Sequence, residues 1–315
     1  MVFVMRQIFR RSTAQSIKIH DTASDRIFMI FLYVILAMVL IVVLYPLWFV
    51  LVASVSDSRY VNSGAMLFLP KGFTLMGYEL AFRDNRILIG YGNTLIYTVF
   101  GTLLATSTNV LAGYALSRKD LPGRNFLMLF FVFIMYFSGG LIPFYMVVQS
   151  LHLINTRWIL ILLGGTSVYN IIITRSFFMS SIPTELFEAA SMEGCGNGRF
   201  FFSIVLPLSK AIIAVIALYC AVGQWNAYFN AMIFLTDRSK FPLQLYLRDI
   251  LLVGKSYESA EVMKTMDPSV QMKMQTASEV VKYGVIVIST LPIILVYPFL
   301  QKYFVQGVMI GSIKG

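Results

Sequence analysis

The sequence predicts an all-α membrane protein with six transmembrane helices. Hydrophobic residues make up 58% of the 315 residues and charged residues only 13%, about half the charged share of a typical soluble domain. Such a chain has too little polar surface to cover a soluble globule. Six apolar runs are each long enough to cross the hydrocarbon core, roughly 30 Å thick, as a helix.

The expected spans follow a basic N-terminal segment, and we place them at about 27–55, 90–116, 126–149, 158–179, 208–235 and 280–300. The first run is too long for the core of a signal peptide, so we interpret it as an uncleaved span, with a kink at Tyr45-Pro46. The third is interrupted by Ser138-Gly139-Gly140 and by Pro143. The predicted organisation is a cytoplasmic N-terminal segment (1–26), a six-helix transmembrane domain (27–300) and a cytoplasmic C-terminal tail (301–315).

The net charge of +10 fits a membrane protein better than a nucleic-acid-binding one. The basic residues are scattered among loops and form no compact patch with interleaved aromatic residues. The loop 117–125 holds three basic residues in nine, against four in the 34 residues of 56–89. This bias favours, without deciding, an arrangement with 117–125 and both termini in the cytoplasm of a multi-pass protein of the inner (cytoplasmic) membrane. Six basic and six acidic residues in 236–279 oppose it weakly, because long loops count for less.

Motifs for catalysis or metal binding are absent from the sequence. Cys195 lies in a loop and Cys220 in a span, so no disulfide is expected. His20 and His152 are far apart and have no carboxylate at ligand spacing. There is no Gly-x-x-x-x-Gly-Lys-Ser/Thr loop, no Gly-x-Ser-x-Gly elbow and no His-Glu-x-x-His pair. We therefore expect a chain without enzymatic activity, cofactor or metal, which must take its energy from a partner.

The polar loop 182–207 is predicted to contain a short helix lying across the membrane surface. Pro183 suits the first turn of a helix, and Glu185 would lie near the positive end of its dipole. One side of the helix is expected to carry Leu186, Phe187 and Ala190. The chain is expected to turn at Gly194, Gly196 and Gly198. A short helix that carries small side chains such as alanine fits a groove on another protein.

The same loop resembles the EAA loop of ABC importer permeases. The shared pattern is Glu188, Ala189, Ala190, Gly194, Ile204, Leu206 and Pro207 at the family's spacing. Ala112–Arg118, Trp225-Asn226 and the ending Tyr303–Gly311 are also similar to the permeases that move oligosaccharides, with the smaller, MalG-like half as the nearest shape. The alternative for the loop is an ordinary connector with chance alanines.

The resemblance implies the six-helix fold of type I ABC importer permeases, with the loop as a cytoplasmic coupling helix. Glu188 would pair with a basic group on a separate ATPase subunit, and Gly194 would make the turn. The implied partners are a second, different permease, two ATPase chains that use ATP and Mg, an extracytoplasmic sugar-binding protein and the lipid bilayer. The tail 301–315 would either reach the ATPase pair or be a frayed end.

The fifth span is the best candidate for lining the substrate pathway. Gly223, Ala227 and Ala231 recur every fourth residue and predict close helix approach. The polar and aromatic candidates are Gln224, Trp225, Asn226, Tyr228 and Asn230. Such groups inside a membrane face a cavity or another helix, so each could bind sugar or hold helices together. In some importers of this kind, mainly the partner half holds the sugar.

Weaker candidates are Tyr136 and Tyr145, because aromatic residues at span ends usually form interface belts. Glu185 and Glu193 are expected to be capping, docking or solvated charges.

The predicted function is a permease subunit of an ATP-dependent importer for an oligosaccharide or related sugar. The alternatives are an ABC permease for another solute, an intramembrane enzyme, and a secondary transporter. A secondary transporter should carry charges within its spans, where Arg175 is the only obvious one.

Overall fold

The computed structural model describes residues 22–259 and 281–296, without the side chains of 252–259, and its regular elements there are all helical. The chain divides into two compact units, 1–50 and 51–315. The expectations for residues 1–21, for 260–280 and for 297–315, which include the C-terminal tail, lie outside the described residues.

The first unit consists largely of α2 (Ala23–Ser54), a helix of 32 residues with Pro46 inside it. Thr22 and Asp25 cap its beginning reciprocally. The Thr22 N–H donates to the Asp25 carboxylate at 2.9 Å, and the Asp25 N–H donates to the Thr22 hydroxyl at 3.2 Å. The helix is long and apolar enough to cross a membrane, as the sequence predicts for 27–55.

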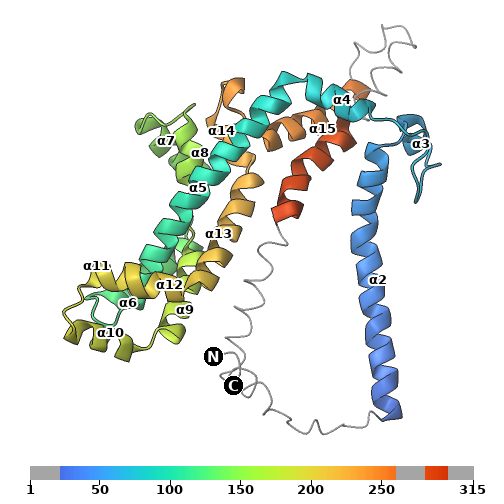
Figure 1. Ribbon diagram of the computed structural model, residues 1–315. Helices are drawn as coiled ribbons and strands as arrows, with labels where there is room; N and C mark the ends of the chain where they lie inside the picture. Colours follow the sequence, from blue (N-terminus) through green and yellow to red (C-terminus); the bar gives the residue numbers. More distant parts are fainter. Residues whose placement is uncertain (1–21, 260–280, 297–315) are drawn as a thin grey trace, which may run out of the picture. The chain divides into compact units, whose positions relative to one another are not determined.

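The second unit is organised around α5 (Asn85–Ser117), a continuous helix of 33 residues. Asp84 caps it by accepting a hydrogen bond from the Arg86 N–H at 2.9 Å, so the helix begins five residues before the expected span. It packs against α9 (Val168–Ser181) and α13 (Lys210–Trp225), as Figure 1 shows for α13. A Cβ on Gly113 would lie 2.8 Å from the side chain of Thr174 in α9, which makes this packing close.

Three apolar segments of the second unit are bent pairs rather than single straight helices. Helices α6 (Arg124–Tyr136) and α7 (Leu141–Ser150) meet at 113°, across the expected break at 138–140. Helix α8 (Arg157–Leu163) meets α9 at 45°, and the segment Asn197–Leu208 meets α13 at 82°. Helices α2 and α5 can each cross a membrane alone, and the described residues hold up to five spans if every bent pair is one. The count of six therefore stays a prediction.

The expected fifth span, 208–235, is not one helix. Helix α13 ends at Trp225, and α14 (Phe229–Phe234) begins after a break. Asn226 caps the end of α13: its side-chain amide and its backbone N–H both donate to the Val222 carbonyl, at 2.9 Å and 3.1 Å. Consequently Gly223, Ala227 and Ala231 do not form one helical stripe. Further along the chain, the apolar helix Val281–Val296 falls within the expected sixth span.

The polar segment after α14 contains an amphipathic helix that was not predicted from the sequence. A 3₁₀ turn (Arg238–Lys240) leads into α15 (Leu243–Ser259). Leu243 is fully buried, and its N–H donates to the hydroxyl of Thr94 in α5 at 2.8 Å. A Cβ on Gly90 would lie 2.7 Å from the Tyr246 ring, so only a glycine lets α15 approach α5 this closely. Two short helices precede α5: α3 (Ser58–Asn62) and α4 (Met76–Arg83).

Candidate functional site

The loop 182–207 folds into a short helix, α10 (Thr184–Met192), followed by α11 (Asn197–Phe200), a π-helical turn (Phe201–Val205) and α12 (Leu206–Leu208). Pro183 is the N-cap of α10, and Glu185 lies in its first turn. Of the three glycines expected to end the helix, only Gly194 has a positive φ, +75°. The Cys195 N–H then donates to the Ala190 carbonyl at 2.9 Å, which closes the helix end.

The inner face of α10 packs into an aromatic cluster. Ala190 is buried with Phe178 of α9 and with Phe200, Phe201 and Val205, and Phe187 meets the edge of the Phe200 ring at 5.3 Å between centroids. The expectation that Leu186 shares this face is wrong. Leu186 is 41% exposed and does not belong to the cluster, since it lies beside Ala190 on the side away from Phe187, at the margin of the buried arc.

The other residues of the family pattern divide between the surface and this cluster. Glu188 and Ala189 are exposed and form the outer face of α10. Ile204 and Leu206 pack against the aromatic cluster, and Pro207 is an exposed residue at the start of α12. Glu193 is exposed beside the turn. An inner face that is fixed and an outer face that is free suit a helix that binds a partner.

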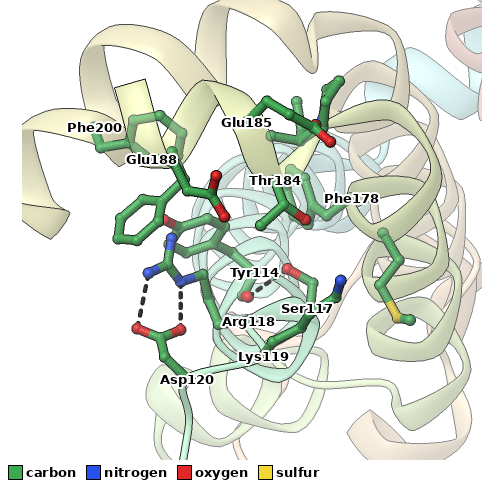
Figure 2. A pocket seen from close by; sticks show the side chains of 14 residues that line it. Tyr114, Ser117, Arg118, Lys119, Asp120, Phe178, Thr184, Glu185, Glu188 and Phe200 are labelled. Atoms are coloured by element: carbon green, nitrogen blue, oxygen red, sulfur yellow. Dashed lines mark hydrogen bonds and ion pairs between the residues drawn. The ribbon is translucent and has the colours of Figure 1, made fainter. Parts of the chain in front are cut away.

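Arg118, the residue that ends α5, contacts α10 directly. Its guanidinium carbon lies 3.4 Å from the centroid of the Phe187 ring. The same group holds Asp120 with two hydrogen bonds of 2.8 Å, shown in Figure 2. These hydrogen bonds lower the pKa of the Asp120 carboxyl from its ordinary value. The planar guanidinium is therefore held between a carboxylate at its edge and a ring at its face.

A cavity of about 490 Å³ opens where α5, α9 and α10 meet, and we call it the α10 cavity. Its apolar wall contains Tyr114, Phe178, Phe187 and Phe200, and its rim contains Arg118, Lys119, Asp120, Glu185 and Glu188. The Tyr114 ring packs on Phe201 at 4.8 Å and on the edge of Phe178 at 5.8 Å. The loop 118–120 and α10 thus lie at the same end of α5.

A second cavity, about 340 Å³, lies between α5, the α8–α9 bend and α13, and we call it the central cavity. Two of the five pathway candidates line it, Gln224 and Asn230. The other polar lining residues were not singled out from the sequence: Tyr97, Thr166, Ser167, Asn170 and Tyr219. Two of these residues could have been found from the sequence, because the run Gly164-Gly165-Thr166-Ser167 interrupts an apolar span.

The remaining pathway candidates lie outside the lining of the central cavity. The indole N–H of Trp225 donates to the Ser289 carbonyl at 2.8 Å, and the ring meets the edge of Tyr91. Asn226 and Tyr228 are exposed. These contacts join α13 to the helix Val281–Val296 and to α5, while a sugar-binding role for these three residues stays an untested prediction.

The two weaker aromatic candidates also differ in their surroundings. Tyr136 is 81% exposed at the end of α6, whereas Tyr145 stacks on Phe234 with 5.9 Å between ring centroids. In the described part of the chain, both cysteines are free and no cluster of His, Cys, Asp or Glu could hold a metal ion. Cys220 lines the central cavity and accepts weak hydrogen bonds from Asn109 at 3.8 Å and Asn170 at 3.7 Å.

Comparison with known proteins gives close relatives over nearly the whole chain, although no protein-family model matches. The chain is 38% identical over 291 residues to the polygalacturonan/rhamnogalacturonan transport system permease protein YtcP of Bacillus subtilis, covering 92% of this chain and 99% of that protein. It is 29% identical to the maltodextrin transport system permease protein MdxG of the same organism, over 90% of this chain and 95% of that one.

A solved structure gives the same result. It is the crystal structure of a bacterial ABC transporter involved in the import of the acidic polysaccharide alginate, with a TM-score of 0.79 at 32% identity over 90% of this chain and 98% of that chain. The chain belongs to the family of carbohydrate ABC importer permeases. As a member, the permease is a multi-pass membrane protein and a transport subunit of a larger ABC complex. The resemblance drawn from the EAA pattern is confirmed.

Proposed function

We propose that the permease forms one half of the translocation pathway of an oligosaccharide importer and is driven by a separate ATPase that binds α10. The observation that carries this proposal is the two-sided character of α10. Its inner face, Phe187 and Ala190, is fixed in the aromatic cluster, and its outer face exposes Glu188 and Ala189. A partner that binds the outer face therefore pulls on the helix bundle through the inner one.

The proposed topology has six spans, with both termini in the cytoplasm of an inner-membrane protein. The spans are α2, α5, α6–α7, α8–α9, α13 and the helix Val281–Val296. The spans α6–α7 and α8–α9 lie between the basic loop 117–125 and α10 in the chain. The loop and α10 therefore belong on the same side of the membrane. Their meeting in the α10 cavity supports this arrangement, and the positive-inside rule makes that side the cytoplasm.

The proposed complex contains a second, different permease, two ATPase chains and an extracytoplasmic sugar-binding protein. The ATPase chains would bind ATP and Mg, and the permease would bind no cofactor. The central cavity is the proposed sugar contact of this half. Amide and hydroxyl groups of Gln224, Asn230 and Tyr219 suit sugar hydroxyls, and the ring of Tyr97 offers an apolar face.

An oligosaccharide that contains uronic acids is the proposed substrate class. The name of YtcP refers to polygalacturonan and rhamnogalacturonan, and the solved relative to the acidic polysaccharide alginate. Among the described residues that line the central cavity there is no Asp or Glu to repel a carboxylate. Uptake of oligogalacturonides should exceed uptake of neutral maltodextrins of equal length. The opposite preference would exclude this substrate class and leave the importer assignment intact.

The coupling role of α10 is tested with the double variant Glu188→Lys, Gly194→Pro in the reconstituted complex. We expect the variant chain to insert and assemble, while sugar uptake is lost and sugar no longer stimulates ATP hydrolysis. Glu79→Lys is the matched control, since it reverses an exposed glutamate on the short helix α4. Normal uptake by the double variant, or uptake by the permease without an ATPase, would refute the proposal.

A further inference from the structure

The C-terminal end of α5 is fastened to its neighbours by three contacts of different kinds. Gly113 permits close packing on Thr174 of α9. The Arg175 Nε–H of α9 donates to the Leu116 carbonyl at 3.1 Å, which satisfies a free acceptor in the last turn of α5. The third contact is the guanidinium of Arg118 over the ring of Phe187. Of these three contacts only the third joins α5 to α10, and it adds a fixed cation to the apolar cluster in which Val110 and Tyr114 of α5 already pack with α10.

We propose that Arg118 is a positioning residue for energy coupling, which locks α10 to the end of α5 so that a displacement of α10 is delivered to α5. The proposal rests on the proposed coupling function of α10. Among the described residues, no hydrogen bond or ion pair links α10 to the loop 118–123. The stacking contact is therefore the specific link between these two segments.

The geometry of Arg118 suits a lock better than a solvated surface charge. Its side chain is only 15% exposed, whereas Asp120 is 59% exposed. The two hydrogen bonds to Asp120 fix the plane of the guanidinium, and the flat face then covers Phe187. Phe187 cannot move away freely, because the Phe200 ring stands against it. A cation held over an aromatic ring in a partly desolvated position is attracted more strongly than an exposed ion pair.

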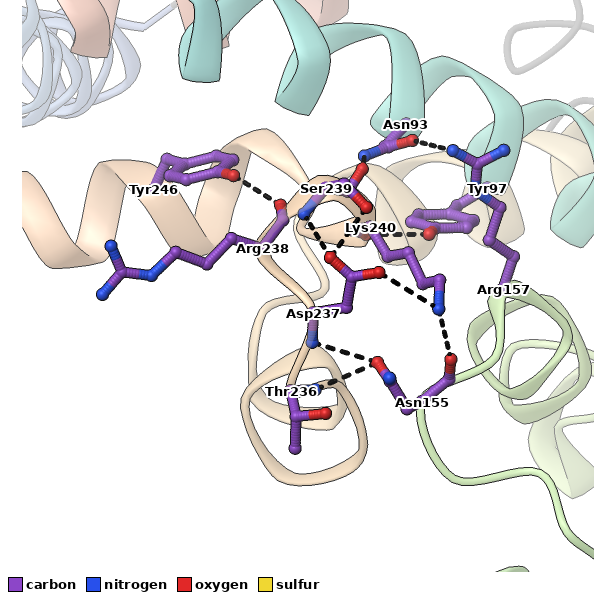
Figure 3. Close-up of polar contacts among 10 residues, drawn as sticks. All are labelled: Asn93, Tyr97, Asn155, Arg157, Thr236, Asp237, Arg238, Ser239, Lys240 and Tyr246. Carbon is purple, nitrogen blue, oxygen red and sulfur yellow. Dashed lines mark hydrogen bonds and ion pairs between the residues drawn. The ribbon is translucent and has the colours of Figure 1, made fainter.

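Helix α5 can carry such a displacement to the other end of the second unit. It is unbroken from Asn85 to Ser117, about 50 Å at 1.5 Å per residue. In its first half, Tyr97 lines the central cavity and its hydroxyl donates to the Lys240 carbonyl at 2.8 Å. Asn93 donates to the Ser239 carbonyl at 2.8 Å, as Figure 3 shows. The lock thus connects α10 to residues of the sugar pathway through one helix.

The competing explanation is that Arg118 and Asp120 are an ordinary loop ion pair with no effect on transport. Lys119 distinguishes the two explanations, because it is an exposed cation next in sequence that also lines the α10 cavity. Lys119 forms no ion pair with the described residues. If charge in this loop is all that matters, Arg118→Gln and Lys119→Gln should act alike.

The test compares sugar transported per ATP hydrolysed in the reconstituted complex for Arg118→Gln, Phe187→Leu, their combination and Lys119→Gln. We expect each of the first two to lower the ratio by about two- to thirtyfold. The combined variant should lose little more than the more severe single variant, because both remove the same contact. Arg118→Lys should retain part of the coupling, and Lys119→Gln should equal the wild type.

A second readout reports the position of α10 rather than overall folding. A spin label on Cys195, just after α10, should become more mobile in Arg118→Gln, in a chain that carries Cys220→Ala so that Cys195 is its only thiol. If Arg118→Gln fails to assemble, Phe187→Leu and Arg118→Lys carry the test. Suppose that Arg118→Gln changes neither the sugar transported per ATP hydrolysed nor the label mobility, while Glu188→Lys, Gly194→Pro uncouples the complex. This result would refute the role of Arg118 and leave the coupling function of α10 intact. If that double variant also transports sugar normally, the proposed coupling function of α10 is itself refuted.

Discussion

The side-chain amide of Gln224 lies in a notch between the backbones of Gly101 and Gly164. A Cβ atom on Gly164 would lie 1.6 Å from the Gln224 Nε2 atom, and one on Gly101 would lie 2.2 Å from it. The amide donates to the Leu160 carbonyl at 3.3 Å. One glutamine of α13 thereby bonds to α8 and packs against α5 beside the central cavity, and the two glycines leave the room that its amide occupies.

Gly164→Ala should destabilise the permease because the new methyl group displaces this amide. The amide is the far end of a flexible side chain, so it moves and loses its bond to Leu160, at a cost of about 1 kcal/mol or more. Thermal unfolding in detergent measures the loss. Gln224→Ala in the same chain removes the clash, so the double variant should be no less stable than Gln224→Ala alone. Gly223→Ala, where no atom lies within 4 Å of the new Cβ, is the control, and fully additive losses would contradict the notch.

Gly194→Ala should strain the turn that follows α10. Gly194 has a φ of +75°, and a residue with a Cβ pays about 1–2 kcal/mol in this left-handed conformation. Gly196→Ala is the matched control, because its φ is not positive and no atom lies within 4 Å of the added Cβ. We expect lower stability and lower uptake for Gly194→Ala only, measured by thermal unfolding and by transport in vesicles. Equal effects at both positions would show that the turn does not depend on Gly194.

Asn155 is expected to be the main support of the loop after α14. Its side-chain oxygen accepts hydrogen bonds from the backbone N–H groups of Thr236 at 3.2 Å and Asp237 at 3.0 Å, and its carbonyl accepts one from Lys240 Nζ at 2.8 Å. Its φ is +58°. Asn155→Ala should therefore lower stability both by losing two acceptor contacts and by backbone strain.

Asn155→Gly separates these two effects, because glycine tolerates a positive φ but lacks the amide. Asn155→Ala should be less stable than Asn155→Gly by about 1 kcal/mol. Both should be less stable than the wild type in thermal unfolding. If the two variants are equally stable, backbone strain does not contribute at this position.

Cys220 provides a native probe of the central cavity. In a Cys195→Ser chain it is the only thiol, since the sequence contains two cysteines. We expect a small hydrophilic methanethiosulfonate reagent to modify it in the assembled complex and a bulky polyethylene-glycol maleimide to fail, as mass spectrometry would show. Transported sugar at about ten times its Kd should slow the modification about tenfold. Modification that occurs only after denaturation would exclude Cys220 from the substrate path.

The α10 segment shows which structural features could be predicted from the sequence and which could not. Pro183, Glu185 and Gly194 placed a short helix and its end correctly, because helix starts and left-handed turns are local properties of the chain. Leu186 was assigned to the wrong face, since a spacing pattern of three residues does not fix which arc of a helix is buried. Arg118 was noted as a loop charge and as the end of the family-like segment Ala112–Arg118, but its place beside α10 was not predicted, because its contact with Phe187 joins segments 69 positions apart.

The apolar runs by themselves determined that this chain is a helical membrane protein, because burial in lipid requires long apolar segments whatever their packing. The Glu-Ala-Ala pattern also determined the transporter family. Tertiary structure alone decided that the fifth run breaks after Trp225, that α15 packs on α5 at Gly90, and that Gln224 rather than Trp225 reaches the central cavity. These outcomes depend on which helices approach each other closely, and composition and periodicity along one segment carry no information about the neighbour it will meet.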